Sequence, residues 1–399
     1  MMLRRDLLKF AGAAAPLMAS SRVWAAPAGA QRSQRLLVVF LRGAYDAANV
    51  VIPTSSDFYY QARPTLQIAR PDPQNPDAAL PLDPDFSLHP ALKDSLYPLW
   101  QKRQLAFVPF AGTGDLSRSH FETQDVIELG QPLTGTRDFN SGFMSRLYGQ
   151  LHGVRPIAFT DQVPLTFRGG AQVPNIGIAS VGKPGVDDRQ ARLIMDMYQG
   201  SPLEKSVAEG FEVRDEVYQS VTEMQQANRG AASPKGFELS ARRIGRLMKT
   251  DYALGFVDVG GWDTHVNEGA AKGYLADRLG ELGRGLNGFV EEIGPDAWND
   301  TVVVVVSEFG RTFRENGSRG TDHGHGSVYW VMGGQVRGGR IAGPQVRVQQ
   351  ASLNQDRDYP VLTDYRDLLG GLFARAYGLD QARMSQVFPQ ATAADLQLI

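Results

Sequence analysis

Two short polar segments carry most of the side chains that could bind a metal ion. Asp263 and His265 place a carboxylate and an imidazole two positions apart, so both can point the same way in an extended segment. A glycine-flanked segment then carries Asp322, His323 and His325. Imidazole and carboxylate donors without sulfur suit zinc, manganese or another divalent ion. The pattern predicts a site for one or two divalent ions per chain.

Other donors stand elsewhere in the chain. Asp46 follows an apolar run, and Glu308 comes shortly after five consecutive valines. A carboxylate beside so apolar a segment is costly unless it is paired or coordinated. His120 also lies in a polar segment that follows an apolar run, whereas His89 and His152 have no such context. We therefore add Asp46 and Glu308 to the predicted site and expect His89 and His152 to be structural.

Three arginines flank these donors: Arg42, Arg118 and Arg311. A guanidinium fork suits the oxygens of a phosphate or sulfate group, so Arg118 or Arg311 could steady an oxyanion. Alternatively, the arginines balance the charge of the carboxylates. For the site as a whole, the alternative to a metal ion is a salt-bridged polar cluster around these three arginines.

Ser119 stands where the pattern changes from loop to helix. With Glu122 three positions later, it is typical of a helix cap. The alternative is a nucleophile, because a helix N-terminus stabilises negative charge and a nearby metal ion can lower the pKa of a hydroxyl group. Ser117 is the second candidate for that role.

The elements that must position these side chains follow from the apolar pattern. Continuous apolar runs are typical of strands buried on both faces of a parallel sheet. Five runs are predicted to be strands: 36–41, 105–110, 253–259, 301–306 and 328–332. Apolar residues three and four apart predict helices over 239–250, 271–293 and 364–376. The alternation predicts an α/β fold with a mostly parallel central sheet flanked by helices, and the polar segments follow its strands.

Composition excludes several classes of protein. The chain has 399 residues, a formal net charge of −2 and no cysteine. Without cysteine there is no disulfide scaffold, thiolate metal site, cysteine nucleophile or lipoprotein anchor. The near-neutral charge argues against a broad basic face, so we expect no nucleic-acid partner.

The first residues have the layout of an export signal. Arg4 and Arg5 form a twin-arginine pair, an alanine-rich stretch follows, and Val23, Trp24 and Ala25 resemble a cleavage site. We expect a signal peptide over 1–25, the twin-arginine translocase as a partner, and a periplasmic or secreted protein. The apolar stretch is too short for a stable membrane span. The rest, 34–399, is predicted to be one domain with insertions near 57–90 and 160–235.

Several motifs resemble one family over about residues 34–375. They read FLRGAYDAANVVIP, LHPAL, RSHFETQD, GWDTHVNEG and SEFGRTFRENGSRGTDHGHG. The chain is similar to the domain-of-unknown-function 1501 family, bacterial exported proteins related to the alkaline phosphatase and sulfatase superfamily. In the first motif, Ala44 and Ala47 stand where the family usually has glycines. The resemblance implies an alkaline-phosphatase-like fold.

The same resemblance implies a two-metal centre. Asp46 and Glu308 would hold one ion, and Asp263, His265 and one of His323 and His325 would hold the other. Phe309 follows Glu308 where alkaline phosphatases carry a histidine, and His120 is the candidate to replace it. The chain lacks the motif of a formylglycine sulfatase.

The hypothesis that follows is an exported metal-dependent hydrolase of phosphate or sulfate esters. Ser119 or a metal-activated water would attack, and the substrate would be a small-molecule or glycan ester. The alternative is a non-catalytic periplasmic binding or assembly protein that keeps the fold, with or without a structural ion.

Overall fold

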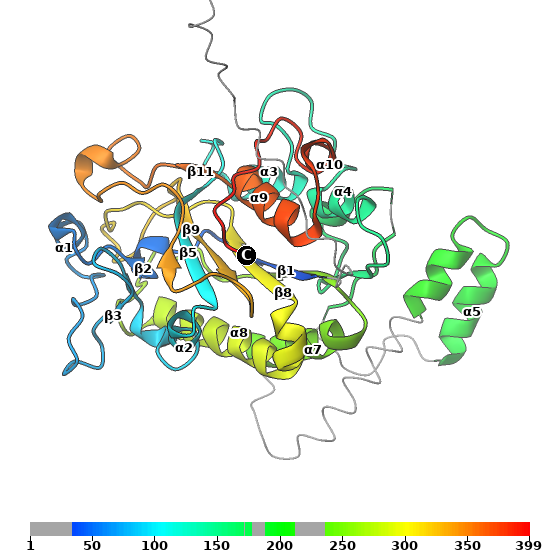
Figure 1. The fold of residues 1–399 in the computed structure, drawn as a ribbon, viewed down its shortest axis with the longest axis horizontal. Helices are drawn as coiled ribbons and strands as arrows, with labels where there is room; N and C mark the ends of the chain where they lie inside the picture. Colours follow the sequence, from blue (N-terminus) through cyan, green and yellow to red (C-terminus); the bar gives the residue numbers. More distant parts are fainter. Residues whose placement is uncertain (1–33, 171, 178–187, 212–235) are drawn as a thin grey trace, which may run out of the picture. The chain divides into compact units, whose positions relative to one another are not determined.

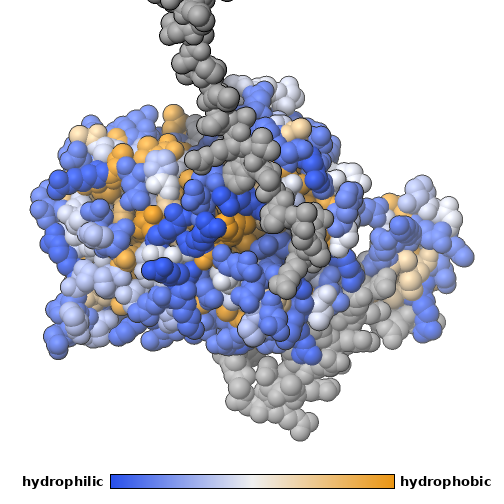
Figure 2. All heavy atoms as spheres, viewed as in Figure 1, coloured by the Kyte–Doolittle hydropathy of each residue, from blue (hydrophilic) through white to orange (hydrophobic). Residues whose placement is uncertain are grey.

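The computed structural model describes residues 34–170, 172–177, 188–211 and 236–399. The predicted signal peptide over 1–25 and parts of the predicted insertion over 160–235 lie outside these residues. None of the described helices is long and apolar enough to cross a membrane. On the face drawn in Figure 2, polar side chains cover most of the described surface, with smaller apolar groups between them.

The described residues form a central sheet with the strand order β10-β5-β9-β8-β1-β7-β6, and β11 also pairs with β5. The strands are β1 (Arg35–Leu41), β5 (Leu105–Gly112), β6 (Pro156–Ala158), β7 (Leu254–Val259), β8 (Thr301–Ser307), β9 (Ser327–Met332), β10 (Arg340–Ile341) and β11 (Thr363–Asp364). All pairings are parallel except those of β9 with β5 and β8. The predicted mostly parallel sheet and its five apolar strands are thus confirmed.

The five longer strands, β1, β5, β7, β8 and β9, are mostly apolar because both faces of the sheet are covered (Figure 1). Alternate side chains of β1 enter different cores: Leu37 and Val39 join one, and Leu36 and Val38 join the other. The first core contains α2 (Tyr97–Gln101), α7 (Phe237–Thr250) and α8 (Tyr274–Asn299). The second contains α3 (His120–Leu129), α4 (Phe143–Gly149), α9 (Tyr365–Tyr377) and α10 (Gln381–Val387).

Local sequence fixes where these helices begin and end. The Ser119 side chain accepts a hydrogen bond from the backbone N–H of Glu122 at the start of α3, and Gly130 ends that helix in a left-handed conformation with φ 61°. Asp364 caps α9 in the same way. The predicted helices over 239–250 and 364–376 are confirmed, and the third, over 271–293, extends to Asn299 through a break at Gly294.

The segment over 57–90 packs against the body of the protein. It contains α1 (Asp57–Ala62) and the strands β3 (Leu80–Pro81) and β4 (Ser87–Leu88), which form a small sheet with the preceding strand β2 (Val51–Ile52) in the order β2-β4-β3. Tyr59 and Leu88 are fully buried in the first core. A further helix, α5 (Asp188–Tyr198), lies in the predicted insertion over 160–235.

The direction of β9 determines where the histidine-rich loop lies. Because β9 is antiparallel to β8, the residues between them leave and enter the sheet at the same edge. That edge also holds the carboxyl ends of β1, β5 and β7. The polar segments that follow these strands are therefore brought to one place.

Candidate metal centre

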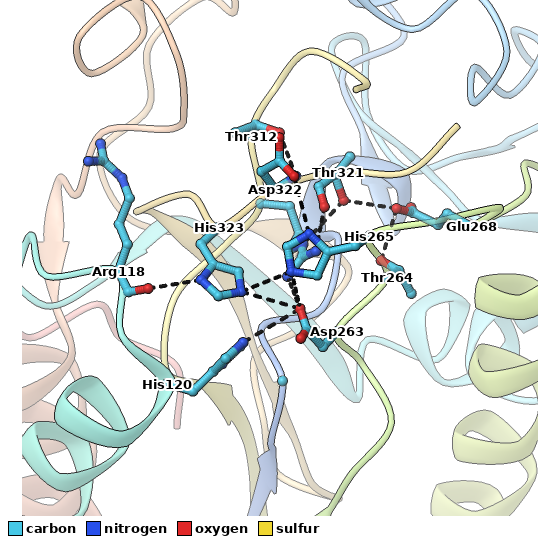
Figure 3. A network of polar contacts seen from close by, with 12 residues as sticks. Arg118, His120, Asp263, Thr264, His265, Glu268, Thr312, Thr321, Asp322 and His323 are labelled. Atoms are coloured by element: carbon cyan, nitrogen blue, oxygen red, sulfur yellow. Dashed lines mark hydrogen bonds and ion pairs between the residues drawn. The ribbon is translucent and has the colours of Figure 1, made fainter. Parts of the chain in front are cut away.

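Three imidazoles converge on one carboxylate at this edge (Figure 3). The Oδ1 atom of Asp263 lies 2.9 Å from His265 Nε2, 3.4 Å from His323 Nε2 and 3.5 Å from His120 Nε2. The donor atoms of His120, Asp263 and His323 all lie within 4.8 Å of one another, and we call these residues the three-donor group. Of the predicted donors, the structure thus brings together Asp263 and three histidines, His120, His265 and His323, around one carboxylate oxygen.

Each imidazole is oriented through its other nitrogen. His120 Nδ1 lies 2.8 Å from Glu308 Oε1, His265 Nδ1 lies 3.1 Å from Asp322 Oδ1, and His323 Nδ1 lies 2.9 Å from the carbonyl oxygen of Arg118. These oxygens can only accept, so each Nδ1 is the donor. The Nε2 atoms then present lone pairs toward Asp263, as metal-binding histidines do.

The resulting cluster of acceptors would be stabilised by protons or by a metal ion. His120 Nε2 is buried and makes no hydrogen bond within the described part of the chain. His265 Nε2 and His323 Nε2 lie only 3.1 Å apart. Lone pairs and a carboxylate at these distances repel unless protons or a metal ion lie between them. The residues present therefore fit a divalent ion.

The charges around the cluster favour ion binding. Burial alone would raise the pKa of Asp263, but the hydrogen bond and charge of Arg311, whose Nη1 lies 2.6 Å from Oδ1, lower it. Burial lowers the pKa of His323, which favours the neutral ring that a ligand must be. The hydrogen bond to Glu308 raises the pKa of His120 and makes its imidazole more basic.

Glu308 lies behind His120 and outside the three-donor group. It is fully buried, and its Oε1 accepts hydrogen bonds from His120 Nδ1, Gln124 Nε2 and the backbone N–H of Gly43. Its Oε2 accepts from Ser307 Oγ at 2.9 Å. With both oxygens engaged, Glu308 orients a predicted ligand, whereas the family resemblance implied that it would bind an ion directly.

Asp46 also departs from the expected ligand set. It is 1% exposed, and both of its oxygens accept hydrogen bonds from the guanidinium of Arg63. Arg63 further donates to the carbonyl oxygens of Phe313 and Thr312. Burial would raise the pKa of Asp46, but the charge of Arg63 lowers it. The structure thus places a buried ion pair where the resemblance implied a second ion.

The predicted arginines have partners of their own. The Arg311 side chain is buried and donates to Asp263 and Thr321. Arg118 donates to Asp358 and Gln355. Arg42 donates to three side chains, those of Asp258, Gln124 and Glu128. Arg311 thus pairs with a predicted site carboxylate, whereas Arg118 and Arg42 pair with side chains outside the predicted set. A role for Arg118 or Arg311 in binding an oxyanion stays a prediction.

The two candidate nucleophiles have structural contacts. Ser119 caps α3, and its backbone N–H donates to Ser117 Oγ at 3.3 Å. Ser117 Oγ donates to Asp115 Oδ2 at 2.8 Å. No contact of either hydroxyl with His120, Asp263 or His323 occurs among the described residues. Their catalytic role remains a prediction.

The other two predicted donors, Asp322 and His325, lie outside the three-donor group. Asp322 accepts from His265 Nδ1 and, at 3.1 Å, from Asn316 Nδ2. His325 is 7% exposed, and its nearest charged neighbours include Asp358 and Asp115. Burial lowers the pKa of His325. It is not brought to the three-donor group.

The contacts of His89 fit its expected structural role, and that role of His152 stays a prediction. His89 is fully buried and caps a short helix by accepting the backbone N–H of Ala91, while its Nε2 contacts the carbonyl oxygen of Ala270 at 3.1 Å. His152 is exposed.

Several side chains around the cluster gave no signal in the sequence. Phe121 follows His120 and is 85% exposed, and Val266 follows His265 and is 60% exposed. Arg357 Nη2 donates to the carbonyl oxygen of His323 at 3.1 Å, and its side chain is 45% exposed. These three residues belong to no motif of their own. Only their position next to the predicted metal-binding residues or their contact with one identifies them, so they could be found only after the fold was known.

The chain was also compared with known proteins. A family model described as "Protein of unknown function (DUF1501)" matches residues 33–388. A search of curated proteins found no match.

Among solved structures, the chain is similar to a protein in the alkaline phosphatase superfamily from Vibrio parahaemolyticus, with a TM-score of 0.35 and 12% identity over 78% of this chain. It spans 63% of the length of that protein. It is similar to Ps i-CgsB in complex with k-i-k-neocarrahexaose, with a TM-score of 0.42 and 12% identity over 90% of this chain and 75% of that one. It is also similar to the lipoteichoic acid synthase LtaP from Listeria monocytogenes, with a TM-score of 0.39 and 10% identity over 92% of this chain and 76% of that one.

Proposed function

Because the chain belongs to the DUF1501 family, which is described only by its unknown function, we propose an activity from the site itself. The proposal is a metal-dependent hydrolase of phosphate or sulfate esters. The observation that carries it is the convergence of three imidazole Nε2 atoms on the carboxylate of Asp263. This donor set is built for a cation and is open enough for a small molecule to reach.

His120, Asp263 and His323 would hold one divalent ion. Zinc is favoured over manganese because two of the three donors are imidazole nitrogens. A single ion is favoured because Asp46 and Glu308 are engaged by other partners. A bound ion would supply Lewis acidity that stabilises negative charge on an ester oxygen.

His265 and Asp322 are suited to move a proton beside the ion. The His265 side chain is 40% exposed, the most open of the three converging imidazoles, and Asp322 holds its Nδ1. Its Nε2 faces the cluster and can accept a proton from an attacking water, then return it to the leaving oxygen. Water is favoured over Ser119 because the serine hydroxyl caps α3.

Two features of the surroundings support an anionic ester with an apolar or ring-shaped part. Arg357 is anchored to the carbonyl oxygen of His323, and half of its side chain is open to solvent, where it can bind a phosphate or sulfate oxygen. Phe121 and Val266, which directly follow His120 and His265 in the sequence, offer exposed apolar surface. A glycan ester or a small aromatic ester would fit this combination.

The activity is proposed to lie in the periplasm or outside the cell. The support is the twin-arginine pattern over 1–25, which also makes the twin-arginine translocase the expected partner during export.

The test measures metal content and ester hydrolysis of the full chain, purified without chelator. Asp263→Ala and His323→Ala are expected to lose the ion and turnover together. His265→Gln is expected to keep the ion and lose at least 100-fold in turnover of nitrophenyl phosphate or sulfate, because it removes only the proton carrier. His325→Gln is the matched control, since it alters a nearby histidine outside the three-donor group.

The outcomes separate the alternatives. An ion that survives both Asp263→Ala and His323→Ala would overturn the proposed centre. An ion that is lost as expected, with no turnover of any phosphate or sulfate ester by the unmutated protein, would instead favour the non-catalytic binding protein with a structural ion. A circular dichroism spectrum of each variant confirms that it is folded.

A further inference from the structure

Two loops supply most of the cluster, and they lie side by side. The first runs from Asp263 to Glu268, and the second runs from Asn316 to His323. Their backbones are paired: the N–H of Thr321 donates to the carbonyl oxygen of Thr264 at 3.0 Å, and the N–H of Glu268 donates to that of Arg319 at 2.9 Å. The spacing of the two loops therefore decides whether Asp263 and His323 can share an ion.

Glu268 joins the two loops a second time, through its side chain (Figure 3). Its Oε2 accepts a hydrogen bond of 2.9 Å from Thr264 Oγ1 and another of 2.9 Å from Thr321 Oγ1. Thr264 stands between Asp263 and His265 in the first loop. One buried oxygen is thus bonded to both loops.

The network continues to the carboxylate at the centre of the cluster. Thr321 Oγ1 donates to Glu268 and accepts from Arg311 Nε at 3.2 Å. Arg311 Nη1 in turn donates to Asp263 at 2.6 Å. A shift of Glu268 would therefore move both the backbone beside Asp263 and the arginine that holds its carboxylate.

The surroundings of the Glu268 carboxyl group include a second carboxyl group, that of Asp46. Glu268 is fully buried, its Oε1 makes no hydrogen bond within the described part of the chain, and Asp46 acts on its pKa. Arg63 keeps Asp46 ionised, while burial, together with the charge of Asp46, raises the pKa of Glu268 well above its usual value.

We propose that Glu268 is the positioning residue of the metal centre: its buried carboxyl group accepts hydrogen bonds from Thr264 and Thr321, and so fixes the two ligand-bearing loops relative to each other. This inference rests on the proposed metal centre for its purpose, although the connection between the loops stands on its own contacts. No step of the proposed hydrolysis uses Glu268 directly.

Glutamine is a close substitute for Glu268, and that gives the test. Glu268→Gln keeps a side-chain oxygen for the two threonine hydroxyls. Glu268→Ala leaves both hydroxyls without this acceptor. Leu286→Ala, in the core position of α8 that is 1% exposed, is the control for a destabilising change away from the loops.

Two measurements are made on the full chain. The first is the affinity for zinc, by competition with a chromophoric chelator. Glu268→Ala is expected to bind zinc 10- to 100-fold more weakly, the range seen when a residue that orients ligands is lost, whereas Glu268→Gln and Leu286→Ala stay within about threefold of the unmutated protein. The second is amide hydrogen exchange of the metal-free protein, in which Glu268→Ala is expected to speed exchange over 263–268 and 316–323 together.

Each result decides the point. Normal zinc affinity of Glu268→Ala, or failure of Glu268→Gln to restore it, overturns the positioning role. If the unmutated protein binds no zinc, the proposed metal centre fails, and hydrogen exchange alone then tests whether Glu268 connects the two loops. Faster exchange in both loops of Glu268→Ala, but not of Glu268→Gln, supports this connection. Unchanged exchange in Glu268→Ala overturns it.

Discussion

Glu308 is a buried residue that would serve the proposed metal centre without touching the ion. Its Oε1 gathers three donors, and one of them is His120 Nδ1. A carboxylate in this position fixes the ring of a ligand and increases its basicity. Its effect on an ion should therefore be graded, whereas loss of a ligand should be complete.

Glu308→Gln is expected to weaken zinc binding about 10-fold, and Glu308→Ala about 100-fold. The glutamine keeps an oxygen for the three donors but removes the negative charge that raises the pKa of His120. Zinc titration gives the affinity, and NMR titration of the metal-free protein gives the pKa of His120. Glu315→Gln, which changes a carboxylate bonded to Thr65, is the control. Unchanged affinity in Glu308→Ala would mean that Glu308 has no part in the centre.

At the level of single residues, the sequence predicted the kinds of donor better than their partners. Asp263, His120, His265 and His323 do meet, because each follows or precedes a strand at one edge of the sheet. Asp46 does not join them, because Arg63 reaches it from a segment that showed no periodic pattern. Whether a buried carboxylate meets an arginine or an ion depends on tertiary packing, which residue type and spacing do not encode.

Among the elements, the five long strands could be predicted from the sequence, but the antiparallel direction of β9 could not. Continuous apolar runs mark β1, β5, β7, β8 and β9 because both faces of the sheet are covered. The same pattern does not show that β9 runs antiparallel, since a buried strand has similar composition in either direction. Yet this direction places the loop with His323 beside the loop with Asp263.

The contact between these loops depends on a glycine. A Cβ atom at Gly320 would lie 2.3 Å from the backbone carbon and oxygen of His265, whereas one at Gly317, in the same loop, would meet nothing within 4 Å. Gly320→Ala is expected to destabilise the protein by about 1–3 kcal/mol, the usual cost of overpacking, and to weaken zinc binding. Gly317→Ala should do neither. Chemical denaturation and zinc titration check both variants, and equal behaviour of the two would refute the close approach.

For the molecule as a whole, His89 should make stability depend on pH. Burial lowers the pKa of His89 to about 4, below the value of about 6.5 for an exposed histidine. As pH falls through this interval, the unfolded chain takes up a proton that the folded protein excludes. This effect hardly changes the free energy of unfolding above pH 6.5, and it lowers the free energy of unfolding by about 3 kcal/mol near pH 4.

His89→Gln should therefore reduce the loss of stability between pH 7 and pH 4.5 by about 2 kcal/mol, although the variant is less stable than the unmutated protein at pH 7. Urea unfolding at the two pH values gives both quantities. His152→Gln, at an exposed position, serves as the control. A pH dependence identical to that of the unmutated protein would show that His89 does not resist protonation in the fold.

The proposed ligands are far apart along the chain, with roughly half of it between His120 and His323. An ion held by both would act as a cross-link that closes this long loop in the folded state only. By mass action, free ion at 100 times its dissociation constant adds about 2.7 kcal/mol to the free energy of unfolding. The lifetime of the protein against proteases would then vary with the supply of metal in its surroundings, so scarcity of the ion would remove the protein as well as its activity.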